Sequence, residues 1–131
     1  MKIIQPDGWK QPRGYSNGIV AAGRQIFIAG QIGWNEREEL VSDDFAAQAA
    51  QALRNVVAVL HAAGAGPEHL VRMTWYVTDK HDYLAAASDI GNAYREIIGA
   101  QYPAMTLVQV AALLEERAKV EIEATAVVPV P

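Results

Sequence analysis

Two glutamates near the C-terminal end are spaced so that they share one face of a strand. Glu121 and Glu123 alternate with apolar residues in the run KVEIEATAVV, residues 119–128. Alternation with a period of two is typical of a β-strand, whose alternate side chains lie on the same face. A carboxylate held near a substrate can act as a general acid or base. The ordinary alternative is a solvated glutamate on the exposed face of a strand, and spacing alone does not decide between them.

A second alternating run, LVRMTWYVTD, covers residues 70–79. One of its faces is mostly apolar, and the other carries polar side chains, namely Arg72, Thr74, Tyr76 and Thr78. We expect the polar face to join that of Glu121 and Glu123 if the two strands are equivalently oriented. Arg72 is then a candidate for an interface ion pair with one of these glutamates.

Several kinds of chemistry are excluded by composition. The chain has no cysteine, so a disulfide framework, a zinc-thiolate site and cysteine catalysis are ruled out. No two of the three histidines have the spacing of metal ligands. No arrangement of serine, histidine and aspartate indicates a catalytic triad, and AAGAGPEH lacks the lysine of a phosphate-binding loop. We expect neither a metal nor an organic cofactor.

Charge and hydropathy restrict the partners. The 131 residues carry a formal net charge of -4, and the 11 lysines and arginines are scattered along the chain. Nucleic-acid binding requires a concentrated basic surface, so no nucleic-acid partner is expected. No apolar run reaches the length of a membrane span, and no membrane partner is expected either. The absence of cysteine fits a cytoplasmic location.

The helices and strands that position these residues are predicted from the spacing of apolar residues and from the turn and capping residues between them. Residues 18–33 are predicted to form two strands around a turn at Gly23. A helix is predicted from a cap near Ser42 to Gly64, with Gln48 on a face other than the apolar one. A second helix is predicted from a cap at Asp79 or Asp82 to Gly99. Residues 104–113 and 119–128 form the last two strands.

This order of elements predicts an α+β domain with one sheet and both helices on one of its faces. The opposite face would then be left bare, although it holds aromatic and aliphatic side chains. A bare face of this kind tends to associate with another copy of the chain. We therefore expect an oligomer with small-molecule pockets where subunits meet.

Five segments together resemble the Rid family, the RidA/YjgF-type reactive-intermediate deaminases. They are GYSNGIVAAGRQIFIAGQIG, QAAQALRNVVAVLHAAG, VRMTWYVTD, YPAMTLVQVAAL and VEIEATAV, and the resemblance runs from Gly14 to Val127. It implies that residues 1–131 are one Rid-type domain with a chorismate-mutase-like fold. It also implies a homotrimer with pockets between subunits, and cofactor-free hydrolysis of enamines or imines to 2-keto acids and ammonia.

The resemblance also implies site residues, position by position. The tyrosine near the N-terminus that helps to complete the family pocket falls on Tyr15, although a tyrosine there can also simply pack. The Gly-Gln step falls on Gly30 and Gln31. The glutamate that handles the attacking water falls on Glu121. Trp34, which follows the Gly-Gln step, either walls the pocket or plugs a subunit contact.

The match fails at the position that grips the substrate carboxylate. Deaminating members have an arginine directly after the Pro-Ala step, and this chain has Met105 there. Leu107 stands where the family often has cysteine. Methionine cannot supply the charge-assisted, bidentate hydrogen bonds of arginine, so the usual activity on 2-imino acids is doubtful. Arg13 or Arg72 could supply the cation from another direction, but both are also ordinary surface arginines.

Three functions follow from these observations. The first is a Rid-type hydrolase for a small imine, enamine or related carbonyl compound, with an apolar Met105 wall that raises the pKa of Glu121. The second is a non-catalytic trimer that binds a small molecule or another protein. The third is a ribonuclease or translation inhibitor, as some family members are labelled, and the acidic balance makes it the weakest.

Overall fold

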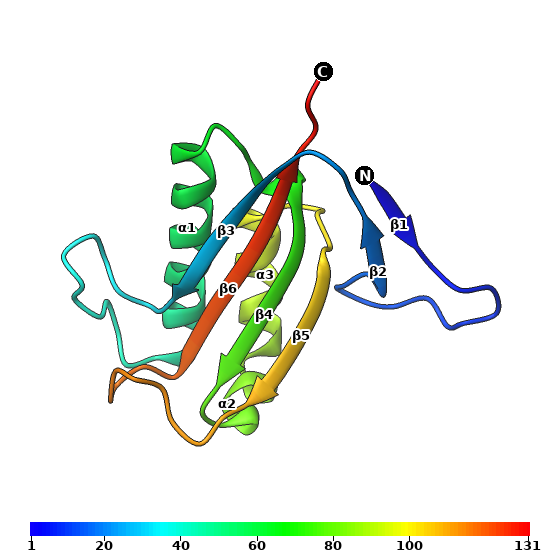
Figure 1. Ribbon diagram of the computed structural model, residues 1–131. Helices are drawn as coiled ribbons and strands as arrows, with labels where there is room; N and C mark the ends of the chain where they lie inside the picture. The colour runs from blue at the N-terminus through cyan, green and yellow to red at the C-terminus, as the bar shows by residue number, and fades with distance from the viewer.

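The main sheet has four strands in a computed structural model that describes residues 1–131 (Figure 1). Their spatial order is β3 (Arg24–Gln31), β6 (Val120–Val128), β4 (Leu70–Val77) and β5 (Ala104–Gln109). β6 lies antiparallel to both of its neighbours, whereas β4 and β5 are parallel. Parallel neighbours need a crossover connection, which here passes through two helices. The outer strands β3 and β5 leave two free edges.

All of the long helices cover one face of this sheet (Figure 1). They are α1 (Phe45–Ala62), α2 (Lys80–Ala85) and α3 (Ala87–Ile97), and a 3-10 turn η1 (Pro67–His69) leads into β4. The buried core lies between this face and the helices, and it includes Leu53, Val56, Leu60, Met73, Trp75, Val77, Val120 and Ile122. The predicted α+β arrangement is therefore confirmed. None of the helices has both the length and the apolar character needed to cross a bilayer.

The opposite face of the sheet carries the polar side chains of β4 and β6, which the alternating sequence predicts on one face. Arg72 lies opposite Thr125, Thr74 opposite Glu123, and Tyr76 opposite Glu121. No helix covers this face (Figure 1), and Phe27 is 74% exposed on it.

The N-terminal region forms a small ribbon that the sequence did not predict. β1 (Lys2–Ile4) pairs with β2 (Gly18–Val20) as a separate two-stranded sheet. The predicted turn near Gly23 is present, but β2 does not pair with β3. Instead the ribbon attaches to the start of β5, because the N–H of Ser16 donates to the carbonyl of Pro103 at 3.1 Å.

Two details of the helices differ from the prediction. The cap of α1 is Asp44, whose carboxylate accepts from the N–H of Ala47 at 3.0 Å. The Ser42 hydroxyl instead accepts from the N–H of Asp44 at 2.9 Å. The predicted second helix is divided at Ala86 into α2 and α3, with the expected cap at Asp79.

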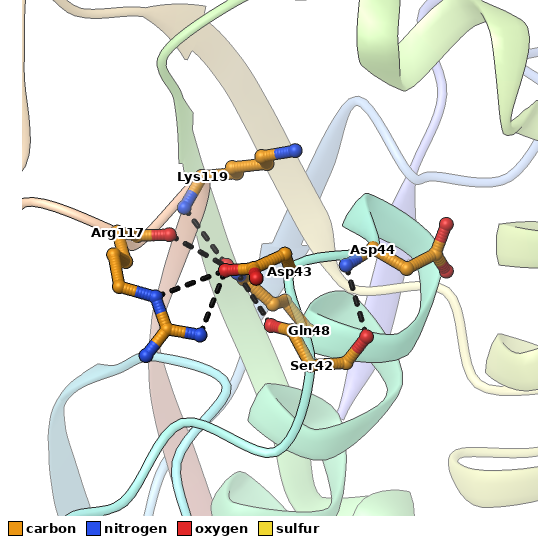
Figure 2. A network of polar contacts seen from close by, with 6 residues as sticks. All are labelled: Ser42, Asp43, Asp44, Gln48, Arg117 and Lys119. Carbon is orange, nitrogen blue, oxygen red and sulfur yellow. Dashed lines mark hydrogen bonds and ion pairs between the residues drawn. The ribbon is translucent and has the colours of Figure 1, made fainter.

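Gln48 also differs from the prediction of a separate polar face, because it is buried together with the apolar residues of α1. Its amide donates to the carbonyls of Ser42 at 2.9 Å and Arg117 at 3.1 Å. Its own carbonyl accepts from the N–H of Lys119 at 2.8 Å. Figure 2 shows that this one side chain joins the start of α1 to the loop before β6.

Candidate functional site

Glu121 lies against the backbone of Gly30 on the bare face of the sheet. The pairing of β3 with β6 shifts its register between Ile28 and Gln31, as at a β-bulge. A Cβ atom placed on Gly30 would lie 2.3 Å from the Oε2 of Glu121, so any larger residue here would displace this carboxylate. The structure therefore brings together two of the residues that the resemblance selects.

The second glutamate on this face has a hydrogen-bond partner. The Tyr76 hydroxyl donates to Glu123 at 2.5 Å. This hydrogen bond, followed by burial and the charges of Glu123 and Glu121, raises the pKa of Tyr76, so the phenol stays protonated. Arg72 forms no ion pair with either glutamate within the chain. The bond to Tyr76 agrees with a structural role for Glu123.

The residues after Gly30 make polar contacts with the backbone and with α1. The side-chain amide of Gln31 donates to the carbonyl of Ala29 at 3.0 Å. Trp34 is half-buried, and its carbonyl accepts from Asn55 at 2.8 Å. Asn55 thus fixes the chain where it leaves β3.

Met105 and Leu107 lie on the helix side of the sheet, away from Glu121. Met105 is level with Met73, and Leu107 is level with Trp75, two fully or almost fully buried core residues. Both side chains pack against the core. Within one chain they therefore do not surround Glu121 with the apolar wall that the sequence predicts.

Met105 instead lines a cavity of about 250 Å³ between β5 and the helices. Four of its ten lining residues are aromatic, namely Trp75, Tyr83, Tyr94 and Tyr102. These four residues, and Arg95, which also lines the cavity, are not among the site residues expected from the sequence. Their one signal was the apolar helix face that includes Tyr83 and Tyr94.

Tyr15 lies beside this cavity and does not line it. The neighbouring Gly14 lines both that cavity and a second hollow of about 410 Å³, which Tyr15 and Arg13 share with Tyr102. The Ser16 hydroxyl donates to the carbonyl of Tyr102 at 2.5 Å and holds this segment in place. Arg13 does not line the Met105 cavity.

The candidate residues thus form two groups in each chain. Glu121 and Gly30 lie on the bare face near the β3 edge, whereas Met105 and Tyr15 lie near the β5 edge. These edges are at opposite ends of the strand order.

Comparison with known proteins identifies the family of this chain. The model of the family described as Endoribonuclease L-PSP matches residues 9–128. A RutC family protein of Synechocystis is 36% identical, over 98% of this chain and 98% of its own length. The 2-iminobutanoate/2-iminopropanoate deaminase of Escherichia coli K12 is 39% identical, over 82% of this chain and 83% of its own length. The chain belongs to the Rid family.

The solved structures show the same Rid fold. A Rid-family protein of unknown function from Yersinia pestis superimposes with a TM-score of 0.85 at 35% identity. The superposition covers 97% of this chain and 98% of the other. The family resemblance drawn from the sequence motifs is therefore confirmed.

Proposed function

We propose that this Rid-family chain is a cofactor-free hydrolase that deaminates a small imine, enamine or related carbonyl intermediate. The observation that carries the proposal is the carboxylate of Glu121 set against Gly30 at an irregular step in β3. The Escherichia coli relative is named as an imine deaminase. This name supports the reaction class and leaves the substrate open.

The chemistry needs one group that moves a proton. A water molecule adds to the carbon of the C=N bond, and Glu121 takes the proton that the water loses. The same carboxyl group then returns this proton to the nitrogen, which gives a carbinolamine. A second proton passes through the carboxyl group from the carbinolamine hydroxyl to the nitrogen, the C–N bond breaks as the C=O bond forms, and a carbonyl compound and ammonia are released. A carboxyl group fits both proton transfers because it can act as base and then as acid.

A complete pocket is proposed to require a second copy of the chain. The two groups of candidate residues lie near opposite edges of the sheet, so the β3 edge of one copy can meet the β5 edge of the next. Repetition of one such contact closes into a ring. We propose the homotrimer that the resemblance implies, with Glu121 and Met105 of different copies facing each other.

The test is competition for imines that are generated in solution. An amino-acid oxidase produces 2-imino acids, and semicarbazide traps them. We expect the protein to lower the yield of trapped product, in proportion to its concentration. A chain with no effect on any imine, although folded and oligomeric, would contradict the proposal.

The Met105→Arg variant separates a changed specificity from a lost activity. If only the variant competes for 2-iminopropanoate, the proton-transfer machinery is intact and wild type acts on a different imine. If wild type competes equally well, another cation holds the carboxylate.

A non-catalytic binding trimer is the second candidate, and Met105 in place of the arginine is the observation that favours it. A binding protein would retain ligand affinity and show no turnover on any imine. Isothermal titration with keto acids and the trapping assay, run on the same preparation, distinguish the two functions.

Gly30→Ala is expected to reduce imine hydrolysis on the order of 100-fold, because small displacements of a catalytic group have effects of this size. The added methyl group would meet the Glu121 carboxylate at 2.3 Å and force it to move. Gly18→Ala is the matched control, because its added Cβ meets Ile4 only at 3.5 Å. Wild-type turnover in Gly30→Ala would show that the contact with Glu121 does not matter for the reaction.

A further inference from the structure

The irregular step in β3 decides which face of the sheet Gly30 occupies. Ile28 is buried under the helices, and regular alternation would place residue 30 on that same face. The pairing with β6 instead gives Ala29 and Gly30 no partner residues of their own between Ile28 and Gln31, as at a β-bulge. The extra residue turns Gly30 to the bare face, where it lies against the Glu121 carboxylate.

Side-chain amides hold the backbone on both sides of this bulge. The amide nitrogen of Gln31 donates to the carbonyl of Ala29 at 3.0 Å, within the bulge itself. The amide nitrogen of Asn55, on α1, donates to the carbonyls of Ile32 at 3.1 Å and Trp34 at 2.8 Å. The path of this segment therefore depends on side-chain donors as well as on strand pairing.

The orientation of the Asn55 amide is fixed from within α1. Gln51, one helical turn earlier, donates to the Asn55 oxygen at 2.9 Å, so the NH₂ group of Asn55 faces the segment that follows the bulge. Gly33 lies directly against the same helix, because a Cβ atom on it would be 2.6 Å from the Cα of Gln48. Helix α1 thus determines where the chain leaves β3.

From these contacts we propose that Asn55 is a positioning residue for Glu121, and that it acts through the bulge at Gly30. The inference rests on the proposed hydrolase function and adds a residue that sets the geometry of the proton-transferring carboxylate. Helix α1 covers the face of the sheet opposite to Glu121, so Asn55 does not touch the reacting atoms (Figure 1). Its effect on the reaction passes through the backbone of β3.

Asn55→Asp keeps the shape of the side chain but replaces its NH₂ group by oxygen, so both carbonyls lose their donor. We expect kcat for imine hydrolysis to fall by up to about 100-fold, the effect of displacing a catalytic group by about 1 Å, with a smaller change in KM. Asn55→Ser removes the same donors without adding a charge, and it replaces the aspartate variant if that variant does not fold.

Asn92→Asp is the matched control. It makes the same chemical change on an exposed side chain of α3, whose oxygen accepts from Arg95 as the oxygen of aspartate also can. We expect wild-type kcat from this variant. Wild-type kcat in Asn55→Asp as well would overturn the inference and leave the hydrolase function intact.

A double-mutant cycle with Gly30→Ala distinguishes positioning from a general structural effect. If Asn55 acts through the bulge, Gly30→Ala has already displaced Glu121, and adding Asn55→Ser should cause little further loss of kcat. If the two losses multiply, Asn55 acts independently of the contact between Gly30 and Glu121, and the inference is wrong.

A second readout does not depend on turnover. NMR of protein labelled with ¹³C at the glutamate carboxyl groups, with the Glu121 signal assigned from Glu121→Gln, reports the surroundings of this carboxylate. The signal should shift in Asn55→Ser and stay in place in Asn92→Asp. An unmoved signal in Asn55→Ser would overturn the inference, whether or not wild type hydrolyses imines. If the signal shifts but no imine is hydrolysed, the positioning role of Asn55 stands and the hydrolase function fails.

Discussion

Replacement of Glu121 by glutamine is expected to lower imine hydrolysis by about 10²- to 10⁴-fold, the usual contribution of a general acid or base. Glutamine keeps the size of the side chain and fits the same space beside Gly30. It cannot accept the proton of the attacking water or return it to nitrogen. The chain should therefore remain folded, with the loss seen in turnover and not in ligand affinity.

Glu123→Gln is the matched control for this variant. Glu123 lies two residues away on the same face, and it accepts a hydrogen bond from Tyr76 that glutamine can also accept. We expect nearly full turnover from it, provided that gel filtration shows an unchanged oligomer. Equal losses in both variants would assign the effect to the charge of this face, and a fully active Glu121→Gln would remove Glu121 from the mechanism.

The sheet faces could be predicted because alternation within a strand needs no knowledge of its neighbours. The runs around Arg72 and Glu121 each alternate, and the structure places their polar residues opposite each other, as expected. The same reasoning does not fix one strand relative to another. A shift of one residue in the pairing of β4 and β5 would move Met105 to the other face.

For this reason the sequence could select Met105 and Glu121 but could not place them on opposite sides of the sheet. The family resemblance assigns both residues to one pocket. It does not say whether a single chain or two copies of the chain supply them. Arg95 was missed for a different reason. An exposed arginine in a helix has no distinctive spacing, and the cavity that it lines forms only when β5 lies beside the helices.

The N-terminal ribbon and the burial of Gln48 could not be predicted from the local spacing of residues. β1 and β2 have three residues each, too few to show a period. Helical spacing predicts Gln48 on a face of α1 other than the apolar one, whereas the structure buries it. Its burial depends on the loop before β6, which has no periodicity to detect.

Replacement of Gln48 by leucine is expected to destabilise the fold by about 3 kcal/mol or more. The side chain is buried and satisfies two carbonyls and one N–H from two distant segments (Figure 2). Leucine has a similar volume but leaves these backbone groups without partners, and each unsatisfied buried group costs about 1–3 kcal/mol. The loss is large beside a total stability of about 5–15 kcal/mol.

Asp43→Asn, in the same network, is the control for this variant. Asp43 pairs with Arg117 at 2.8 Å, but both side chains are more than half exposed. Exposed ion pairs contribute about 0–1 kcal/mol, so this variant should melt close to wild type. Thermal denaturation by circular dichroism, at one protein concentration because binding between copies shifts the midpoint, measures both. A Gln48→Leu midpoint equal to that of Asp43→Asn would show that the loop before β6 does not depend on the buried amide.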